Sequence, residues 1–186
     1  LEPRRLSLDD VNPLHRPLLV YLIVLGIKMA AGLLLRALGY QRIVSNKTGV
    51  TGWYKPAVDP ASAKLLPMIF FHGIAPAGLV LYLPMVLLGL ATDGRAVFLF
   101  ENDSISCRMS FEALTEESTV EGVTELLDRY LDPDTELSLV GHSFGSCQLT
   151  WLLHAPALRH RIRQFVLMDP VTILLSDPDV MVNFLY

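Results

Sequence analysis

The chain has 186 residues, of which 52% are hydrophobic and 18% charged, with a mean hydropathy of +0.42 and a net charge of −4 at pH 7. This length supports one domain with a sizeable core, and a negative net charge without a basic cluster argues against nucleic acid as a partner. Cys107 and Cys147 are interpreted as free thiols, because two cysteines make no disulfide framework and these two lack metal-site spacing. The sequence implies neither a metal nor an organic cofactor.

The first long apolar segment, Leu18–Gly39, contains only two charged residues, Lys28 and Arg36. A helix of about 20 apolar residues is long enough to span the hydrocarbon core of a bilayer, but a lysine near its middle is costly there. Three interpretations stay open: a transmembrane helix, a helix in the plane of the membrane interface, and a helix docked on the body of the protein. We expect residues 1–40 to form an N-terminal segment with an apolar membrane helix, and the protein to be membrane-associated.

Residues 41–186 are predicted to form a domain of alternating strands and helices. The part before residue 65 is interrupted by glycines and prolines, and short strands such as Gly52–Lys55 fit there. Four later apolar runs are typical of buried strands: Met68–Phe71, Ala96–Phe100, Leu137–Val140 and Phe165–Met168. The intervening patterns predict helices at Ala77–Ala91, Ser118–Leu131 and Ser143–His154. This alternation indicates an α/β fold with a doubly wound, mostly parallel sheet and helices on both faces.

Two of these helices carry local signals. Pro84 lies inside the first, so we expect that helix to be kinked or to start late. Ser118 opens the second and is predicted to cap it, ahead of an amphipathic pattern.

The pentapeptide Gly141-His142-Ser143-Phe144-Gly145 matches the pattern G-x-S-x-G. It directly follows a predicted strand and opens a predicted helix, which is the context that a nucleophile elbow requires. Glycines on either side of Ser143 allow a turn sharp enough to lift the serine above the sheet, and the helix N-terminus favours developing negative charge. The alternative is a plain glycine-rich turn. The predicted strand before the motif and the predicted helix after it favour the nucleophile elbow over that alternative.

From about Pro67 to its end the chain resembles the α/β-hydrolase superfamily. More narrowly, it is similar to a poorly characterised group of eukaryotic membrane-associated α/β-hydrolase-domain proteins. That similarity rests on the segments FFHGIAPAGLVLY (residues 70–82), VFLFEN (97–102), LVGHSFGS (139–146) and VLMDPVTILL…VNFLY (166–186). The apolar segment at the N-terminus also fits that group.

The resemblance implies roles for residues in two loops. Ser143 would be the nucleophile, and the backbone amides of Ile74 and Phe144 would form the oxyanion hole. His72, in the His72-Gly73-Ile74 loop after a strand, is expected to orient the loop through a hydrogen bond. His142 is expected to pack with its side chain away from the reacting face.

In this fold the catalytic acid and then the histidine follow the serine in sequence. Only His154 and His160 follow Ser143, the first about 16 Å along the helix and the second beyond it. We expect neither to reach the serine hydroxyl. The last strands, the lid and the histidine loop are therefore expected to be absent from these residues, and the 186 residues alone to lack triad-level activity.

Asp169 ends a strand after the serine, where some members of the fold place the catalytic acid. An Asp-Pro pair also makes a turn without any catalytic role, so both interpretations stay open. Glu101 and Asp103 follow a different strand and are expected to be rim or pocket residues, or solvated turn residues.

Two functions fit these observations. The first is a serine hydrolase that acts on a small-molecule or lipid-like ester through an acyl-enzyme on Ser143. The second is a non-catalytic, membrane-anchored scaffold of the same fold that binds a partner or a lipid. A histidine further along the complete sequence would favour the enzyme.

Overall fold

The computed structural model describes residues 15–107 and 113–173 of the chain. Residues 174–186, which carry the last part of the resemblance, lie outside the described residues.

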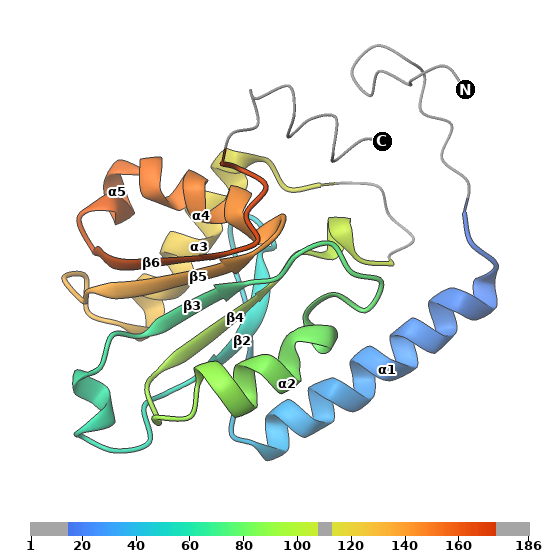
Figure 1. Ribbon diagram of the computed structural model, residues 1–186, viewed down its shortest axis with the longest axis horizontal. Helices are drawn as coiled ribbons and strands as arrows, with labels where there is room; N and C mark the ends of the chain where they lie inside the picture. Colours follow the sequence, from blue (N-terminus) through green and yellow to red (C-terminus); the bar gives the residue numbers. More distant parts are fainter. Residues whose placement is uncertain (1–14, 108–112, 174–186) are drawn as a thin grey trace, which may run out of the picture.

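A six-stranded mixed sheet forms the centre of the molecule (Figure 1). In spatial order its strands are β1 (Gln41–Val44), β2 (Thr51–Lys55), β4 (Val97–Glu101), β3 (Met68–Phe71), β5 (Leu137–His142) and β6 (Ile162–Met168). Strands β4, β3, β5 and β6 are parallel, whereas β1 pairs antiparallel with β2, and β2 antiparallel with β4. The four parallel strands end at one edge of the sheet, so the loops that follow them gather there.

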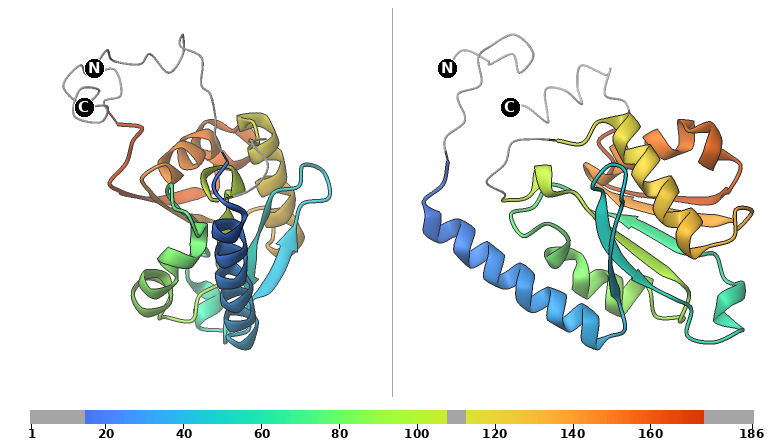
Figure 2. Two further views of the ribbon diagram at one scale, coloured as in Figure 1. Left: turned by 90° about the vertical axis from the view of Figure 1, so that its right-hand side faces the viewer. Right: turned by 180° about the vertical axis from the view of Figure 1, so that it is seen from behind.

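Helices cover both faces of the sheet, as the sequence predicts (Figure 2). On one face lie α3 (Glu116–Tyr130), α4 (Gly145–His154) and α5 (Pro156–Arg159). On the other lie α1 (Leu18–Ala37) and the continuous segment of η2 (Gly78–Tyr82), α2 (Leu83–Met85) and η3 (Val86–Leu90). Short 3₁₀ turns, η1 (Ser62–Lys64) and η4 (Asp103–Ile105), precede β3 and follow β4.

The central strands are buried on both sides, which explains their uninterrupted apolar sequence. Every residue of β3 is buried, and neighbours in the strand belong to different cores. Phe71 packs in the core beneath α3 and α4, and Phe70 in the core beneath α1 and η2. This alternation follows from the two-residue repeat of a strand.

The antiparallel part of the sheet was only partly predictable. The pattern indicated short strands such as Gly52–Lys55, whereas β2 begins at Thr51 and pairs with β1, whose position was not predicted. Strand β1 has four residues, of which only Ile43 is buried. So short a strand at the edge of the sheet leaves almost no hydrophobic pattern.

Two helix predictions need correction. The predicted helix Ala77–Ala91 is a succession of a 3₁₀ turn, a three-residue α-helix and a π-helical turn. Pro84 lies at the start of α2, where its missing N–H does no harm. Helix α3 begins before Ser118: its N-cap is Thr115, whose hydroxyl accepts a hydrogen bond from the Ser118 amide at 3.1 Å. Ser118 is thus inside the first turn and does not cap it.

Helix α1 is the one described helix that is long and apolar enough to cross a membrane. It lies alongside the sheet, next to β1 and η2 (Figures 1 and 2). Only 11% of its most apolar 18-residue window is buried inside the molecule. In this structure α1 is docked on the body of the protein, but only a small part of the helix surface is buried by the contact.

Candidate active site

Ser143 occupies a strained turn between β5 and α4. Its φ is +50°, a left-handed conformation that is uncommon for residues other than glycine. The Ser143 amide donates a hydrogen bond to the Met168 carbonyl at 2.9 Å, and the Ser143 carbonyl accepts one from the Ser146 amide at 2.9 Å. The surrounding structure thus holds a backbone conformation that costs on the order of 1–3 kcal/mol. Such strain at the top of a sheet is typical of a nucleophile elbow.

The two glycines of the motif are required by close packing beneath the turn. A Cβ on Gly145 would overlap the backbone carbonyl of Phe71, at the end of β3. A Cβ on Gly141 would lie 2.9 Å from Leu149 Cδ1 and 3.0 Å from the Gly145 carbonyl oxygen. Helix α4 can therefore start directly over the neighbouring strand only because both side chains are missing.

The loop after β3 meets the turn that carries Ser143. A Cβ on Gly73 would lie only 2.8 Å from Ser143 Cβ and 2.8 Å from the Tyr82 hydroxyl. The proximity follows from the sheet, since β3 and β5 are adjacent and parallel, with Phe71 opposite Gly141. The predicted His72-Gly73-Ile74 loop and the predicted serine are thus brought together.

The amides of Ile74 and Phe144 stay predicted oxyanion-hole donors. Within the described part of the chain, neither amide donates a hydrogen bond to the protein. Ile74 is 64% exposed, and Phe144 is the N-cap of the ten-residue helix α4. Two amides without an internal acceptor beside a serine have the chemistry needed to bind a developing oxyanion.

His72 fixes the conformation of this loop with both ring nitrogens. Its Nε2 accepts a hydrogen bond from the Asn102 amide at 3.0 Å, so its proton is on Nδ1, which donates to the Gly73 carbonyl at 2.8 Å. The side chain is buried, and desolvation lowers the pKa of His72 below its ordinary value. A neutral imidazole with both nitrogens engaged acts as a structural brace and has no free lone pair for a serine.

Tyr82 and His142 form a second brace that the sequence analysis missed. The Tyr82 hydroxyl accepts a hydrogen bond from the Gly73 amide at 3.1 Å and is hydrogen-bonded to His142 Nδ1 at 3.0 Å. This corrects the expectation that His142 points away from the reacting face. Strand β5 extends to His142, and alternation places its side chain on the same face as Val140, toward η2. No sequence signal joins a tyrosine in an apolar segment to a histidine 60 residues later.

No described side chain forms a hydrogen bond with the Ser143 hydroxyl. His154 ends α4, a ten-residue helix that begins beside the serine and is about 15 Å long. His160 precedes β6 and so lies at the opposite edge of the sheet from Ser143. The described residues therefore hold a candidate nucleophile without a general base.

Asp169 directly follows β6 and adopts a φ of +45°. Its neighbour Met168 accepts the hydrogen bond of the Ser143 amide, so this turn lies beside the serine. The Ser146 hydroxyl, fully buried, accepts a hydrogen bond from the Val171 amide at 3.1 Å and anchors the turn to α4. Aspartate is among the residues that tolerate this conformation in turns, and a catalytic role for Asp169 stays a prediction.

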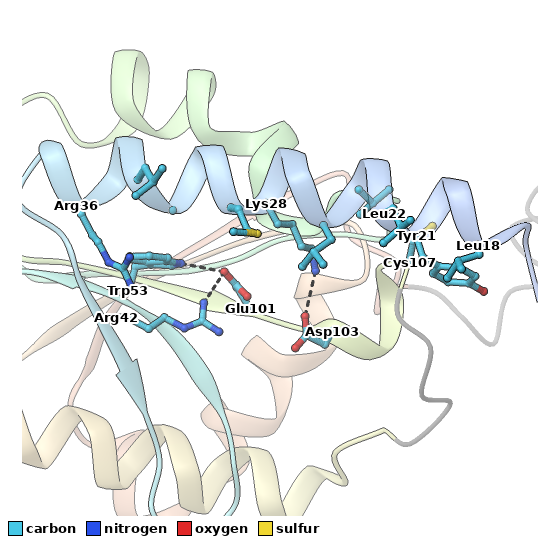
Figure 3. Close-up of a pocket in the computed structure, with 15 residues that line it drawn as sticks. Leu18, Tyr21, Leu22, Lys28, Arg36, Arg42, Trp53, Glu101, Asp103 and Cys107 are labelled. Carbon is cyan, nitrogen blue, oxygen red and sulfur yellow. Dashed lines mark hydrogen bonds and ion pairs between the residues drawn. The ribbon is translucent and has the colours of Figure 1, made fainter.

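Glu101 and Asp103 line a groove of about 600 Å³ between α1 and the end of β4 (Figure 3). Glu101 accepts a hydrogen bond from the Trp53 indole at 2.9 Å and pairs with Arg42 at 2.7 Å. Asp103 pairs with Lys28 of α1 at 3.1 Å. Asp103 thus docks α1, whereas Glu101 fixes Trp53 and Arg42 of the neighbouring strands. Within residues 15–107 and 113–173, no group of three or more His, Cys, Asp or Glu residues could hold a metal ion.

No protein-family model and no curated protein sequence matches the chain. Solved structures do match its fold. A carboxylesterase from the ammonia-oxidizing thaumarchaeon Nitrososphaera gargenis has a TM-score of 0.52 and 16% identity, over 77% of this chain and 50% of that one. The carboxylesterase CesB from Bacillus subtilis has a TM-score of 0.51 and 17% identity, over 79% and 50%. A bacterial membrane phospholipase A has a TM-score of 0.54 and 13% identity, over 82% and 47%.

The chain thus spans about half the length of the solved structures that it matches. At these identities the likeness is one of fold alone, and it confirms the fold class that the sequence predicts.

The close packing at Gly145 predicts a strong effect of one added methyl group. We expect Gly145→Ala to lower the free energy of unfolding by about 1–3 kcal/mol, because rigid backbone blocks the new Cβ. Gly26→Ala in α1 is the matched control, since its Cβ would meet nothing within 4 Å. That change should stabilise the helix by up to about 1 kcal/mol. Urea unfolding of the full-length protein followed by circular dichroism measures both, and equal effects would contradict the packing argument.

The buried, neutral His72 predicts acid sensitivity. Because its pKa is lowered in the folded state, the unfolded chain binds a proton more readily, and stability falls as pH drops below the unfolded pKa of about 6.5. We expect the Tm to decrease between pH 7 and pH 5, and this pH dependence to be weaker in His72→Gln. His160→Gln, at an exposed histidine, is the control and should keep the wild-type pH dependence. An unchanged slope in His72→Gln would refute the assignment.

Proposed function

We propose that this chain, which has the α/β-hydrolase fold, supplies the nucleophile and the oxyanion hole of a serine hydrolase that acts on carboxylic esters. One observation carries the proposal: Ser143 is held in a left-handed turn beside two amides that have no acceptor within the described residues. A strained serine at that position is a device for exposing a hydroxyl to substrate.

The proposed reaction is acyl transfer in two steps. Ser143 Oγ attacks the ester carbonyl carbon while its proton passes to a base, and the amides of Ile74 and Phe144 stabilise the oxyanion. Collapse breaks the bond to the alkoxy oxygen, which leaves as the alcohol after taking the proton. Water then attacks the acyl-enzyme by the same route, releasing the acid and restoring the hydroxyl. In this fold the catalytic residues follow in the order serine, acid, histidine. The proposed base is therefore a histidine that follows Asp169 in the whole protein.

We further propose a lipid-like ester as the substrate and a membrane as the site of action. The support is the exposed apolar surface of α1, and one structure of similar fold is that of a membrane phospholipase A. The groove beside α1, lined by apolar side chains of the helix, is consistent with an amphiphilic ligand.

Labelling of the full-length protein with a fluorophosphonate tests the nucleophile. We expect Ser143 to be modified, and Ser143→Ala to abolish labelling and to lower kcat/KM for p-nitrophenyl esters by at least about 10³-fold. Ser104→Ala, at an exposed serine of η4, is the control and should label like the wild type. Short- and long-chain esters in parallel test the lipid-like substrate.

Labelling that persists in Ser143→Ala would place the nucleophile elsewhere. A full-length protein that binds lipid vesicles but neither labels nor hydrolyses esters would favour the non-catalytic scaffold.

A further inference from the structure

Helix α1 contacts the body of the protein along a single narrow stripe. Val24, Gly32 and Leu35 are buried, and Lys28 is ion-paired with Asp103. The spacings between these four positions place them on one face of a helix. The stripe runs over most of the length of α1, so the helix lies along the body of the protein.

The contacts in this stripe are specific. A Cβ on Gly32 would come within 3.3 Å of the Trp53 ring, so the helix backbone approaches the indole closely. Trp53 is itself buried, and its indole N–H donates a hydrogen bond to the Glu101 carboxylate. The guanidinium groups of Arg36 and Arg42 stack on the same ring at 5.9 and 5.3 Å from its centroid (Figure 3). The lysine that makes the apolar segment unusual as a membrane span is thus used for docking.

The rest of the helix surface is apolar and exposed. Large side chains that are at least one-third exposed surround the other sides of α1. Five of them line the edge of the groove, Leu18, Leu22, Leu25, Met29 and Leu33, and five lie outside it, Leu19, Val20, Ile23, Ile27 and Leu34. A continuous apolar surface of this kind is uncommon on a monomeric soluble protein and marks an interaction site. Helix α1 contains no acidic residue, and Arg16 and Arg36 lie at its two ends. This charge distribution complements an anionic lipid surface.

A docked α1 cannot cross a bilayer, because Arg42, Glu101 and Asp103 would enter the hydrocarbon with it, and buried charges are costly there. An undocked α1 would lose the ion pair and leave Lys28 in the hydrocarbon and the Trp53 ring uncovered. A helix that lies flat avoids both costs, since its outer face enters the acyl-chain region while its inner stripe stays docked.

We infer that α1 lies in the plane of one membrane leaflet, with its outer apolar face among the lipid chains and its inner stripe docked on the sheet. This inference rests on the membrane association proposed above and names its geometry. It requires nothing of the chemistry at Ser143, so the two proposals can fail separately.

Vesicle flotation tests the outer face. Full-length protein is mixed with phosphatidylcholine vesicles that contain phosphatidylglycerol, and we expect it to float with them. Ile23→Asp and Leu34→Asp, at side chains 54% and 49% exposed that do not line the groove, should each weaken binding on the order of tenfold without unfolding the protein. Val58→Asp, at a side chain 60% exposed in the loop after β2, is the matched control and should bind like the wild type.

Labelling of the two ends of α1 tests the orientation. In a Cys107→Ser, Cys147→Ser background, Pro17→Cys and Leu38→Cys place one thiol at either end of the helix, at its N-cap and C-cap and outside the apolar face described above. After binding to preformed vesicles, a flat helix should leave both positions fully reactive toward a membrane-impermeant maleimide, before any detergent is added. In a spanning helix one thiol would face the vesicle lumen and would react with the maleimide only after detergent opens the vesicles. If the protein inserted in both orientations, each thiol would be protected in part. Either result would overturn the inference.

Each of the other possible results either supports or overturns the inference. Protein that does not float overturns the inference and the proposed membrane association together, and leaves the ester-hydrolysis test standing. A dimer in gel filtration that stays away from vesicles would show that a second copy covers the apolar face. Full labelling of both ends in a protein without hydrolase activity would retain the inference and reject the proposed enzyme.

Discussion

The contact between the first turn of α4 and the end of β3 determines the geometry of the whole site. Because Gly145 has no side chain, the start of α4 packs against the Phe71 carbonyl, and the turn that holds Ser143 is pressed against the loop at Gly73. Both glycines of the motif are thus required because a side chain at either position would clash with the neighbouring helix or strand. A strained serine conformation persists only where neighbouring structure enforces it, and here the enforcing elements are a central strand buried on both faces and a helix that starts on top of it.

Features written into short stretches of sequence were predictable. The four parallel strands and the motif Gly141–Gly145 were found because each depends on a few consecutive residues with a strong hydrophobic or glycine pattern, although β6 has no fully buried residue. Strand β1 was missed because its pattern is too short, and the Thr115 cap was misplaced by three residues because Ser118 is an equally good capping residue. The fold class could be predicted, but the exact ends of its elements could not.

Features that depend on tertiary contacts were not predictable. The brace formed by Tyr82 and His142 joins η2 to β5, and nothing in either segment indicates the other. The same holds for Lys28, whose partner Asp103 lies 75 residues away. In the sequence this lysine is an isolated charge in an apolar run, and three arrangements of the helix fitted it, two in a membrane and one docked on the body of the protein. Knowledge of the ion pair turns the lysine from an argument against one arrangement into an argument for a docked helix.

The position of η4 links two parts of the molecule that have separate tasks. Asp103 holds α1 through Lys28, and the preceding Asn102 amide holds His72, which in turn holds the loop at Gly73. Contacts of two neighbouring residues, Asn102 and Asp103, thus connect α1 to the loop that carries the predicted oxyanion-hole amide of Ile74. Thermodynamic linkage is reciprocal. To the extent that docking of α1 stabilises the ordered loop, ordering of the loop stabilises the docked helix equally.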